Sequence, residues 1–419
     1  MVPDTWIFHV TWYDHQADIV KQLTLSYRRS DNCVELYDPK LRRLFLRRTP
    51  APMPLEDHLY VGNTVTIVSR QLKIVDYGDE RTRCALAPRF QKAVMVVKPH
   101  AQEHLGSILQ RLLDSGFALS SVQMVQLDNQ KAKRLLEITA APWPQSENRD
   151  GGGQVDDAFQ SFTDGKAVVV EIVGNDSEKR LKYIVGPDDP AKARQQSPSS
   201  LRASYGISRS QNAVYWSAPE DNNLLLLSEF VSGISAVTPS EISHDCSCCV
   251  IKPSALKYAG NIVDEILSHG FRITAVQSFH LSRNAADEFY EVYKTVLPEY
   301  PQSWTRTRHK HTRLTRNFCR RRIPVPQSLF SGSSLMVDEL AQGVCLAMQV
   351  EHAERDSVAQ LRQLSGPYDP EVARFVRPQS LRAKFGSDRV RNAVHCTDLD
   401  GDAILEVQYF FSVLAHSRQ

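Results

Sequence analysis

The chain contains one sequence pattern twice, and this internal repeat constrains its fold more than any other feature. The frame Leu-Arg-Ala-x-aromatic-Gly occurs at residues 201–206 and again at residues 381–386. A second shared motif, Asn-Ala-Val, follows each frame at the same spacing. The next residue is Tyr215 in the first copy and His395 in the second. Because repeated motifs with constant spacing indicate repeated structural units, we expect two copies of one domain type.

Earlier landmarks repeat as well. A buried-strand run ending in Lys98-Pro99 returns as a run ending in Lys252-Pro253, and a helical pattern that stops at Gly-Phe follows each run. Lys252 stands 154 residues after Lys98, whereas Asn392 stands 180 residues after Asn212. The second copy is therefore the longer one. Each copy reads strand, helix, strand, helix, strand, helix, which predicts an α+β sandwich of the ferredoxin-like βαββαβ kind, with helices on one face.

The first 90 or so residues show a different pattern. Short apolar or alternating segments separated by Asp-Asn, Asp-Pro and Gly-Asn turns predict an all-β domain, a small barrel or sandwich. This stretch resembles the DM-ten domain of ciliary and flagellar proteins at residues 12–14, 45–48 and 76–79. The resemblance implies a pleckstrin-homology-like β fold associated with axonemal microtubules. The predicted domains are a DM-ten-like domain, a first copy and a second copy, at residues 1–91, 92–240 and 241–419.

Composition is that of an ordinary soluble globular protein, with 42% hydrophobic and 23% charged residues. No apolar run approaches the ~18 residues of a membrane span, and the N-terminus lacks the features of a signal peptide. The cysteines number eight and cluster only at residues 246–249, with no second pair at zinc-ligand spacing. We therefore expect a cytoplasmic protein with reduced thiols rather than a metal site, and no membrane partner.

The positive charge is local. The net charge is +2, yet residues 306–322 contain eight Lys or Arg and no acid; the remainder has 42 basic and 48 acidic residues, a net −6. This stretch belongs to a segment at about 303–334 that has almost no apolar periodicity, and we predict a disordered surface loop inserted in the second copy. Two alternatives stay open: electrostatic docking on acidic tubulin tails or nucleic acid, or a tolerated insertion or gene-model error. No specific nucleic-acid partner is expected.

The second copy carries a set of residues suited to phosphoryl transfer. His395 is followed by Glu406, a carboxylate in an otherwise apolar helical stretch, and a histidine whose far nitrogen is held by a carboxylate is a prepared nucleophile. Arg362 and Arg382 offer forks for phosphate oxygens, and Lys252 adds a point charge. The chain has no Gly-x-x-x-x-Gly-Lys loop. The pattern favours transfer through a phosphohistidine, with magnesium arriving on the nucleotide.

Both copies resemble the nucleoside diphosphate kinase family in the Asn-Ala-x-His signature and its flanking Leu-Arg and Lys-Pro motifs. Within that family the domain order is similar to that of the ciliary and centrosomal members. The resemblance implies that His395 is phosphorylated and that Glu406 orients it. It assigns phosphate and ribose contacts, with Mg²⁺ carried by ATP or the nucleoside diphosphate, to Lys252, Tyr290, Arg362, Tyr368, Arg382, Asn392 and Thr397.

This sequence departs from the family pattern at two nucleotide contacts. The phosphate-contacting threonine of the family falls on Tyr368, and its base-stacking phenylalanine falls near Glu299 or Tyr300. The first copy departs further, because the histidine position is Tyr215, the carboxylate position is Leu226 and the first arginine position is Lys182. We predict that the first copy transfers no phosphate, and that it either binds nucleotide weakly or only packs.

Two functions follow from the sequence. The first is a nucleoside diphosphate kinase of modest activity that moves the γ-phosphate of ATP through phospho-His395. The alternative is a structural protein of microtubules, the axoneme or the γ-tubulin complex, with little or no catalysis. The expected location is the cytoplasm and cytoskeleton, in the axoneme of a cilium or flagellum, the basal body or the centrosome. We expect a monomer in which the two copies pair within one chain.

Overall fold

The structure is a computed structural model that describes residues 4–14, 17–51, 53–138, 160–217, 230, 245–291, 335–354 and 356–415. The predicted insertion at 303–334 lies outside the described residues. So do Leu226 and the stacking position near Glu299 or Tyr300.

The N-terminal region is a twisted antiparallel sheet with the strand order β4-β3-β2-β1-β6-β5. Alternation of buried and exposed residues, such as Trp6, Phe8 and Val10 inward on β1, builds its apolar core. The strands are Thr5–Asp14 (β1), Ile19–Arg28 (β2), Cys33–Asp38 (β3), Arg43–Pro50 (β4), Thr64–Ile67 (β5) and Arg70–Tyr77 (β6).

This region also contains one helix that the all-β prediction missed. Helix Glu80–Leu86 (α1) begins where the Asp79 carboxylate accepts a hydrogen bond from the backbone N–H of Thr82. The seven-residue helix is too short to show a clear apolar period. The prediction for residues 1–91 is therefore correct for the sheet and wrong for α1.

The first copy forms one half of a larger antiparallel sheet, with strand order β10-β7-β9-β8. Helices cover both faces of its sheet. Met95 and Val97 pack with α2 and α5 on one face, and Val94 and Val96 pack with α3 on the other. The prediction of helices on one face is therefore wrong. The elements are Gln91–Val97 (β7), Pro99–His104 (η1), Leu105–Asp114 (α2), Ala118–Gln126 (β8), Asn129–Ile138 (α3), Lys166–Gly174 (β9), Ser177–Val185 (α5), Pro190–Gln196 (α6), Leu201–Tyr205 (α7) and Val214–Ser217 (β10).

The second copy repeats this order as β14-β11-β13-β12. Its elements are Ser247–Ile251 (β11), Pro253–Tyr258 (η4), Ala259–Ser268 (α9), Phe271–His280 (β12), Arg283–Phe289 (α10), Leu335–Ala341 (α11), Val344–His352 (β13), Ser357–Ser365 (α12), Pro370–Val376 (α13), Leu381–Phe385 (α14), Val394–Cys396 (β14), Asp400–Gln408 (α15) and Tyr409–Leu414 (η7).

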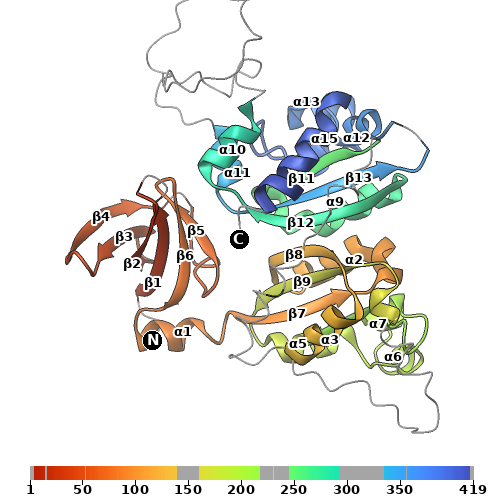
Figure 1. Cartoon of the computed structure of the whole chain (residues 1–419), viewed down its shortest axis with the longest axis horizontal. Coiled ribbons are helices and arrows are strands. Elements are labelled where there is room, and N and C mark those ends of the chain that lie inside the picture. The colour runs from red at the N-terminus through yellow and green to blue at the C-terminus, as the bar shows by residue number, and fades with distance from the viewer. Residues whose placement is uncertain are drawn as a thin grey trace, which may run out of the picture.

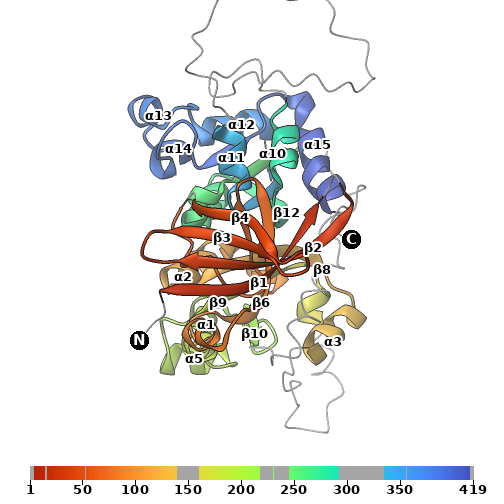
Figure 2. The same ribbon diagram turned by 90° about the vertical axis from the view of Figure 1, so that its left-hand side faces the viewer.

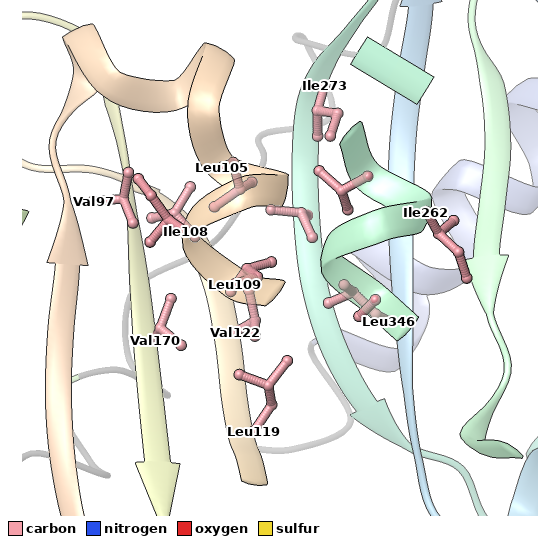
Figure 3. Packing of buried hydrophobic residues seen from close by; sticks show 14 of the residues in the cluster. Val97, Leu105, Ile108, Leu109, Leu119, Val122, Val170, Ile262, Ile273 and Leu346 are labelled. Atoms are coloured by element: carbon pink, nitrogen blue, oxygen red, sulfur yellow. The ribbon is translucent and has the colours of Figure 1, made fainter. Parts of the chain in front are cut away.

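The two copies pair within one chain, as predicted. Strands β8 and β12 meet edge to edge at Gln123 and Gln277, which joins the two half-sheets into one. Helices α2 and α9 pack across the same junction, where a Cβ atom on Gly260 would lie 2.2 Å from the backbone nitrogen of Gln110. One apolar cluster runs through both copies, with Leu105 and Leu109 of α2 on one side and Ile262 of α9 on the other (Figure 3).

The β domain lies beside the junction of the two copies and contacts both (Figure 1; Figure 2). On the side of the first copy, a Cβ atom on Gly62 would lie 2.9 Å from Nζ of Lys92 on β7. Thr66 donates a hydrogen bond to the Ala341 carbonyl of the second copy at 2.8 Å. Among the described helices, none has the length and apolar character to cross a membrane.

Candidate functional site

A strained backbone turn presents the edge strand of each copy. Ala393 has φ +70°, and the N–H of Val394 donates to the Asn392 carbonyl at 2.9 Å, so the three residues form a γ-turn. The backbone N–H of Lys252 donates to the Ala393 carbonyl at 2.9 Å, which ties the turn to the end of β11. The first copy has the same turn at Ala213, with φ +67°, although it lacks the histidine. The strain therefore belongs to the framework of the copies rather than to catalysis alone.

His395 lies on β14 and is held by a carboxylate. Its Nε2 is 2.9 Å from Oε2 of Glu406, and the same oxygen accepts a hydrogen bond from the Thr397 hydroxyl at 2.8 Å. His395 is buried, with 6% of the residue exposed, and its ring meets the ring of Phe289 edge-on at 4.8 Å between centroids. Because Nε2 is occupied by Glu406, the tautomer with the proton on Nε2 is favoured and Nδ1 is the basic nitrogen.

Lys252 is buried beside this histidine, at 1% exposure. Its Nζ donates to the Val390 carbonyl at 3.0 Å. The pKa of Lys252 is lowered to about 7, and burial is the main cause. The Glu339 and Asp388 carboxylates oppose this lowering, whereas the Arg382 charge adds to it. Glu339 is itself buried on α11, where its Oε1 accepts the backbone N–H of Ser254 at 3.1 Å.

Backbone carbonyls fix the guanidinium of Arg382. Its Nε donates to Val394 O at 3.2 Å and one terminal nitrogen donates to Gly366 O at 2.8 Å. The other terminal nitrogen lies 3.6 Å from Sγ of Cys396. A charge held by neutral acceptors keeps its full attraction for an anion, so Arg382 is prepared to bind phosphate oxygens.

Asn392 is nearly fully buried and is only partly satisfied. Its Nδ2 donates to the Tyr368 carbonyl at 3.0 Å. Its Oδ1 has no hydrogen-bond partner in the part of the chain that the structure describes. Since buried polar atoms are normally paired, this oxygen is suited to a donor on a ligand, such as a sugar hydroxyl.

The remaining predicted site residues differ in how deeply they are buried. Tyr290 is fully buried, with its ring 6.2 Å from the His395 ring and 6.0 Å from Nζ of Lys252. The Tyr368 hydroxyl donates to Sδ of Met336 at 3.2 Å. Arg362 stands at the rim, with a side chain that is 54% exposed and an Nε 3.6 Å from Oδ1 of Asp398. Arg362 is thus the least fixed of the predicted phosphate contacts.

The first copy has both buried cations of the second copy, but one of them forms an ion pair within the chain. Lys98 is buried, donates to Ser161 and Ser210, and has its pKa lowered by burial to about 7. Arg202 makes the same backbone contacts as Arg382, but it also forms an ion pair with Asp188. Asp188 stands at the position of Tyr368, so a carboxylate of the chain takes the place where an anionic ligand could pair with Arg202.

Three residues of these sites were missed by sequence reasoning. Glu339 offered a signal, because Asp338 and Glu339 are acids flanked by the apolar residues Val337 and Leu340, but they lie just after the segment predicted as an insertion. Asp188 was detectable from its alignment with Tyr368. Phe289 had no sequence signal beyond its place next to Tyr290. In the described ranges, no group of three or more His, Cys, Asp or Glu side chains could hold a metal ion.

Comparison with known proteins identifies the family of the chain. Residues 91–225, 245–307 and 330–415 match the family model described as nucleoside diphosphate kinase. The chain is 32% identical over 416 residues to nucleoside diphosphate kinase homolog 7 of Rattus norvegicus, covering 98% of this chain and 94% of that protein. The corresponding protein of Mus musculus is 32% identical over 420 residues, with the same coverage.

Single-domain relatives match a part of the chain. The nucleoside diphosphate kinase of Aquifex aeolicus is 29% identical over 167 residues, covering 39% of this chain and 92% of that protein. A crystal structure of the Aquifex aeolicus enzyme has a TM-score of 0.31 and 26% identity, covering 41% of this chain and 97% of that one. The family model and the full-length relatives agree, and the chain therefore belongs to the nucleoside diphosphate kinase family.

Proposed function

We propose that the second copy is a nucleoside diphosphate kinase that moves the γ-phosphate of ATP to a nucleoside diphosphate through phospho-His395. The observation that carries this proposal is the His395–Glu406–Thr397 arrangement beside the buried cations Lys252 and Arg382. An oriented imidazole next to fixed positive charge is what a phosphohistidine path requires.

In the proposed reaction, Nδ1 of His395 attacks the γ-phosphorus of ATP. An N–P bond forms, the bond from the γ-phosphorus to the bridging oxygen breaks, and ADP leaves with that electron pair. A second nucleoside diphosphate then attacks the phosphohistidine through a terminal oxygen of its β-phosphate, which breaks the N–P bond and restores the imidazole. Mg²⁺ would enter and leave with the nucleotides and would offset the negative charge of their phosphates.

Each side chain has a role in this scheme. Glu406 retains the Nε2 proton through its hydrogen bond and stabilises the positive charge that develops on the ring. Lys252 and Arg382 neutralise the transferred phosphoryl group, and Arg362 reaches the outer phosphates from the rim. Asn392 Oδ1 accepts a hydrogen bond from a ribose hydroxyl.

Incubation with γ-labelled ATP tests the proposal. Native protein is expected to acquire an acid-labile, alkali-stable label that nucleoside diphosphates remove. His395→Ala should acquire none, whereas Tyr215→Phe, the matched change in the first copy, should be labelled like native protein. Absence of label on the native protein contradicts the enzyme proposal, and label lost only with Tyr215→Phe reverses the assignment of the active copy.

A structural role on microtubules is the second candidate function. The observation that favours it is that the first copy has Tyr215 and an internally neutralised Arg202, so half of the repeat contributes no phosphotransfer site. The exposed outer strand β4, which ends the sheet, also carries Arg43 and Arg47, a basic edge suited to an acidic surface, whereas the neighbouring Arg48 forms an ion pair with Asp31.

Cosedimentation with microtubules tests this second role. Binding should fall when Arg43 and Arg47 are replaced by glutamate, and unchanged binding contradicts a contact through β4. Localisation on the cytoskeleton of a cilium or at a centrosome belongs to the same proposal, as do the pleckstrin-homology-like class of the β domain and the ferredoxin-like class of the two copies.

A further inference from the structure

The hairpin formed by β5 and β6 contacts the second copy through one cross-strand pair. Thr66 and Gln71 lie directly opposite each other on the two strands. The Thr66 hydroxyl donates to the Ala341 carbonyl at 2.8 Å, and Nε2 of Gln71 donates to the Leu281 carbonyl at 2.6 Å. Nε2 of Gln71 also lies 2.8 Å from Nδ1 of His280.

These acceptors are at the ends of two helices. Ala341 is the last residue of α11, and the last carbonyls of a helix have no partner within it. Leu281 immediately precedes Ser282, the residue whose hydroxyl caps the start of α10. The hairpin therefore supplies hydrogen bonds at the points where α11 ends and where α10 begins. Figure 1 shows the β domain on the side of the second copy where these two helices lie.

The two helices carry side chains of the proposed nucleotide site. Helix α10 leads into Phe289 and Tyr290, which surround the His395 ring at 4.8 and 6.2 Å between centroids. Helix α11 carries the buried Glu339, which opposes the lowering of the pKa of Lys252. We call α10 and α11 the clamp helices.

A direct bond joins the clamp helices to each other. Nε of Arg283 on α10 lies 2.9 Å from Oδ1 of Asp338 on α11. A displacement of either helix end is therefore shared by both. Rigid helices linked by a polar contact transmit a shift at one end to the side chains at the other.

The turn of the hairpin has a strained backbone. This strain is an independent indication that contacts with the rest of the protein fix the position of the hairpin. Val68 and Ser69 connect the strands with φ +47° and +60°. Two-residue turns with positive φ at both positions normally use Asn-Gly, and a β-branched residue in this region is an outlier. Strained backbone persists where the surrounding contacts determine it, and it concentrates at functional positions.

We propose that the β5–β6 hairpin braces the clamp helices, so that Thr66 and Gln71 are positioning residues for nucleoside diphosphate binding in the second copy. This inference rests on the proposed function for the identity of the ligand. Neither residue touches the site. Both act by keeping α10 and α11 in the arrangement that places Tyr290 and Glu339.

The chain offers a matched control for the test. Thr64 and Lys73 form the next cross-strand pair on the same face of the hairpin, farther from the turn. The bracing variant is Thr66→Val with Gln71→Met, which removes both donors at nearly constant size. The control variant is Thr64→Val with Lys73→Met. Thr66→Ser with native Gln71 keeps the donor and serves as the conservative rescue.

The measurements use the full chain. ADP affinity is measured by calorimetry, phosphoenzyme by labelled ATP, and hydrogen exchange is followed over residues 283–291 and 335–341. We expect the bracing variant to bind ADP about three- to tenfold more weakly, because each hydrogen bond is worth roughly a factor of two to ten and its loss lowers the population of the competent clamp. Exchange in the clamp helices should be faster, while the control and rescue variants match native protein.

The outcomes separate the brace from the proposed function. Equal ADP affinity and equal exchange in native protein and the bracing variant overturn the brace. Equal weakening by the control variant also overturns it, because the effect is then a general loosening of the β domain. If native protein binds ADP but acquires no label, the kinase reaction is refuted. The bracing role of the hairpin is then tested by ADP affinity and hydrogen exchange alone. A native protein that binds no ADP refutes both.

Discussion

Replacement of Glu406 by glutamine tests how the nucleophile is prepared. The Glu406 carboxylate accepts hydrogen bonds from both His395 and Thr397 through one oxygen, in a site where the side chains of Glu406 and His395 are 12% and 7% exposed. Glutamine keeps the shape of the side chain and removes its charge. The variant therefore isolates the electrostatic part of the contact.

The size of the effect follows from the hydrogen bonds. A hydrogen bond to a charged group is worth about 1.5–3 kcal/mol and a neutral one about 0.5–1.5 kcal/mol, so the change removes about 1.5 kcal/mol. At roughly 1.4 kcal/mol per decade, this is about a tenfold loss in the rate of phosphoryl transfer. If the amide turns its NH₂ group toward Nε2, the proton moves to Nδ1 and the loss approaches about a hundredfold.

The assay is the rate of phosphoenzyme formation from labelled ATP by rapid quench, with ADP affinity measured in parallel. We expect Glu406→Gln to slow labelling by about 10- to 100-fold and to leave ADP affinity nearly unchanged, because Glu406 acts through His395. Asp402→Asn, on the same helix, is the control and should remain within about twofold of native protein. A Glu406→Gln variant that is labelled at the native rate refutes the orienting role.

The other predictions concern a lysine, an internal carboxylate and a glycine. Burial lowers the pKa of Lys252 to about 7, and a bound phosphate favours the charged form of this lysine. ADP binding at pH 8 should therefore take up a proton, whereas binding at pH 6 should not. Calorimetry in buffers of different ionisation enthalpy measures this proton uptake, and Lys252→Arg should abolish it. Asp188→Thr removes the carboxylate beside Arg202, so weak ADP binding should appear in the first copy as a second site in calorimetry, and an unchanged number of sites contradicts Asp188 as a stand-in for phosphate. Gly260→Ala places a Cβ against the backbone of Gln110, so the free energy of unfolding in urea should fall by about 1–3 kcal/mol; a native midpoint contradicts close packing of α2 on α9.

The sequence predicted those parts of the molecule that depend on local pattern. Alternation predicted the strands of the β domain, and the buried runs before Lys98 and Lys252 predicted β7 and β11. The repeat also located the His395 region and, through the spacing to Glu406, a hydrogen bond that the structure places at 2.9 Å. The functional roles of these residues stay predictions until they are measured.

Contacts between distant segments could not be predicted from pattern. Glu339 is important because of its place near Lys252, and nothing in its local sequence says which helix end it reaches. The contact of Gln71 with Leu281 joins residues from different domains, and a single glutamine on a strand has no distinguishing signal in the sequence. The helices on both faces of the sheet were missed because a strand buried on both sides loses the alternation that reveals its faces.

The edge-to-edge junction of β8 and β12 has a consequence for assembly. Two halves that meet within one chain associate intramolecularly, so their effective concentration does not depend on the amount of protein in solution. The joined sheet should therefore have a melting temperature that does not vary with protein concentration, in contrast to an assembly of separate chains. Each half also covers an open strand edge of the other, so that either copy produced alone would expose a template for aggregation that the complete chain keeps closed.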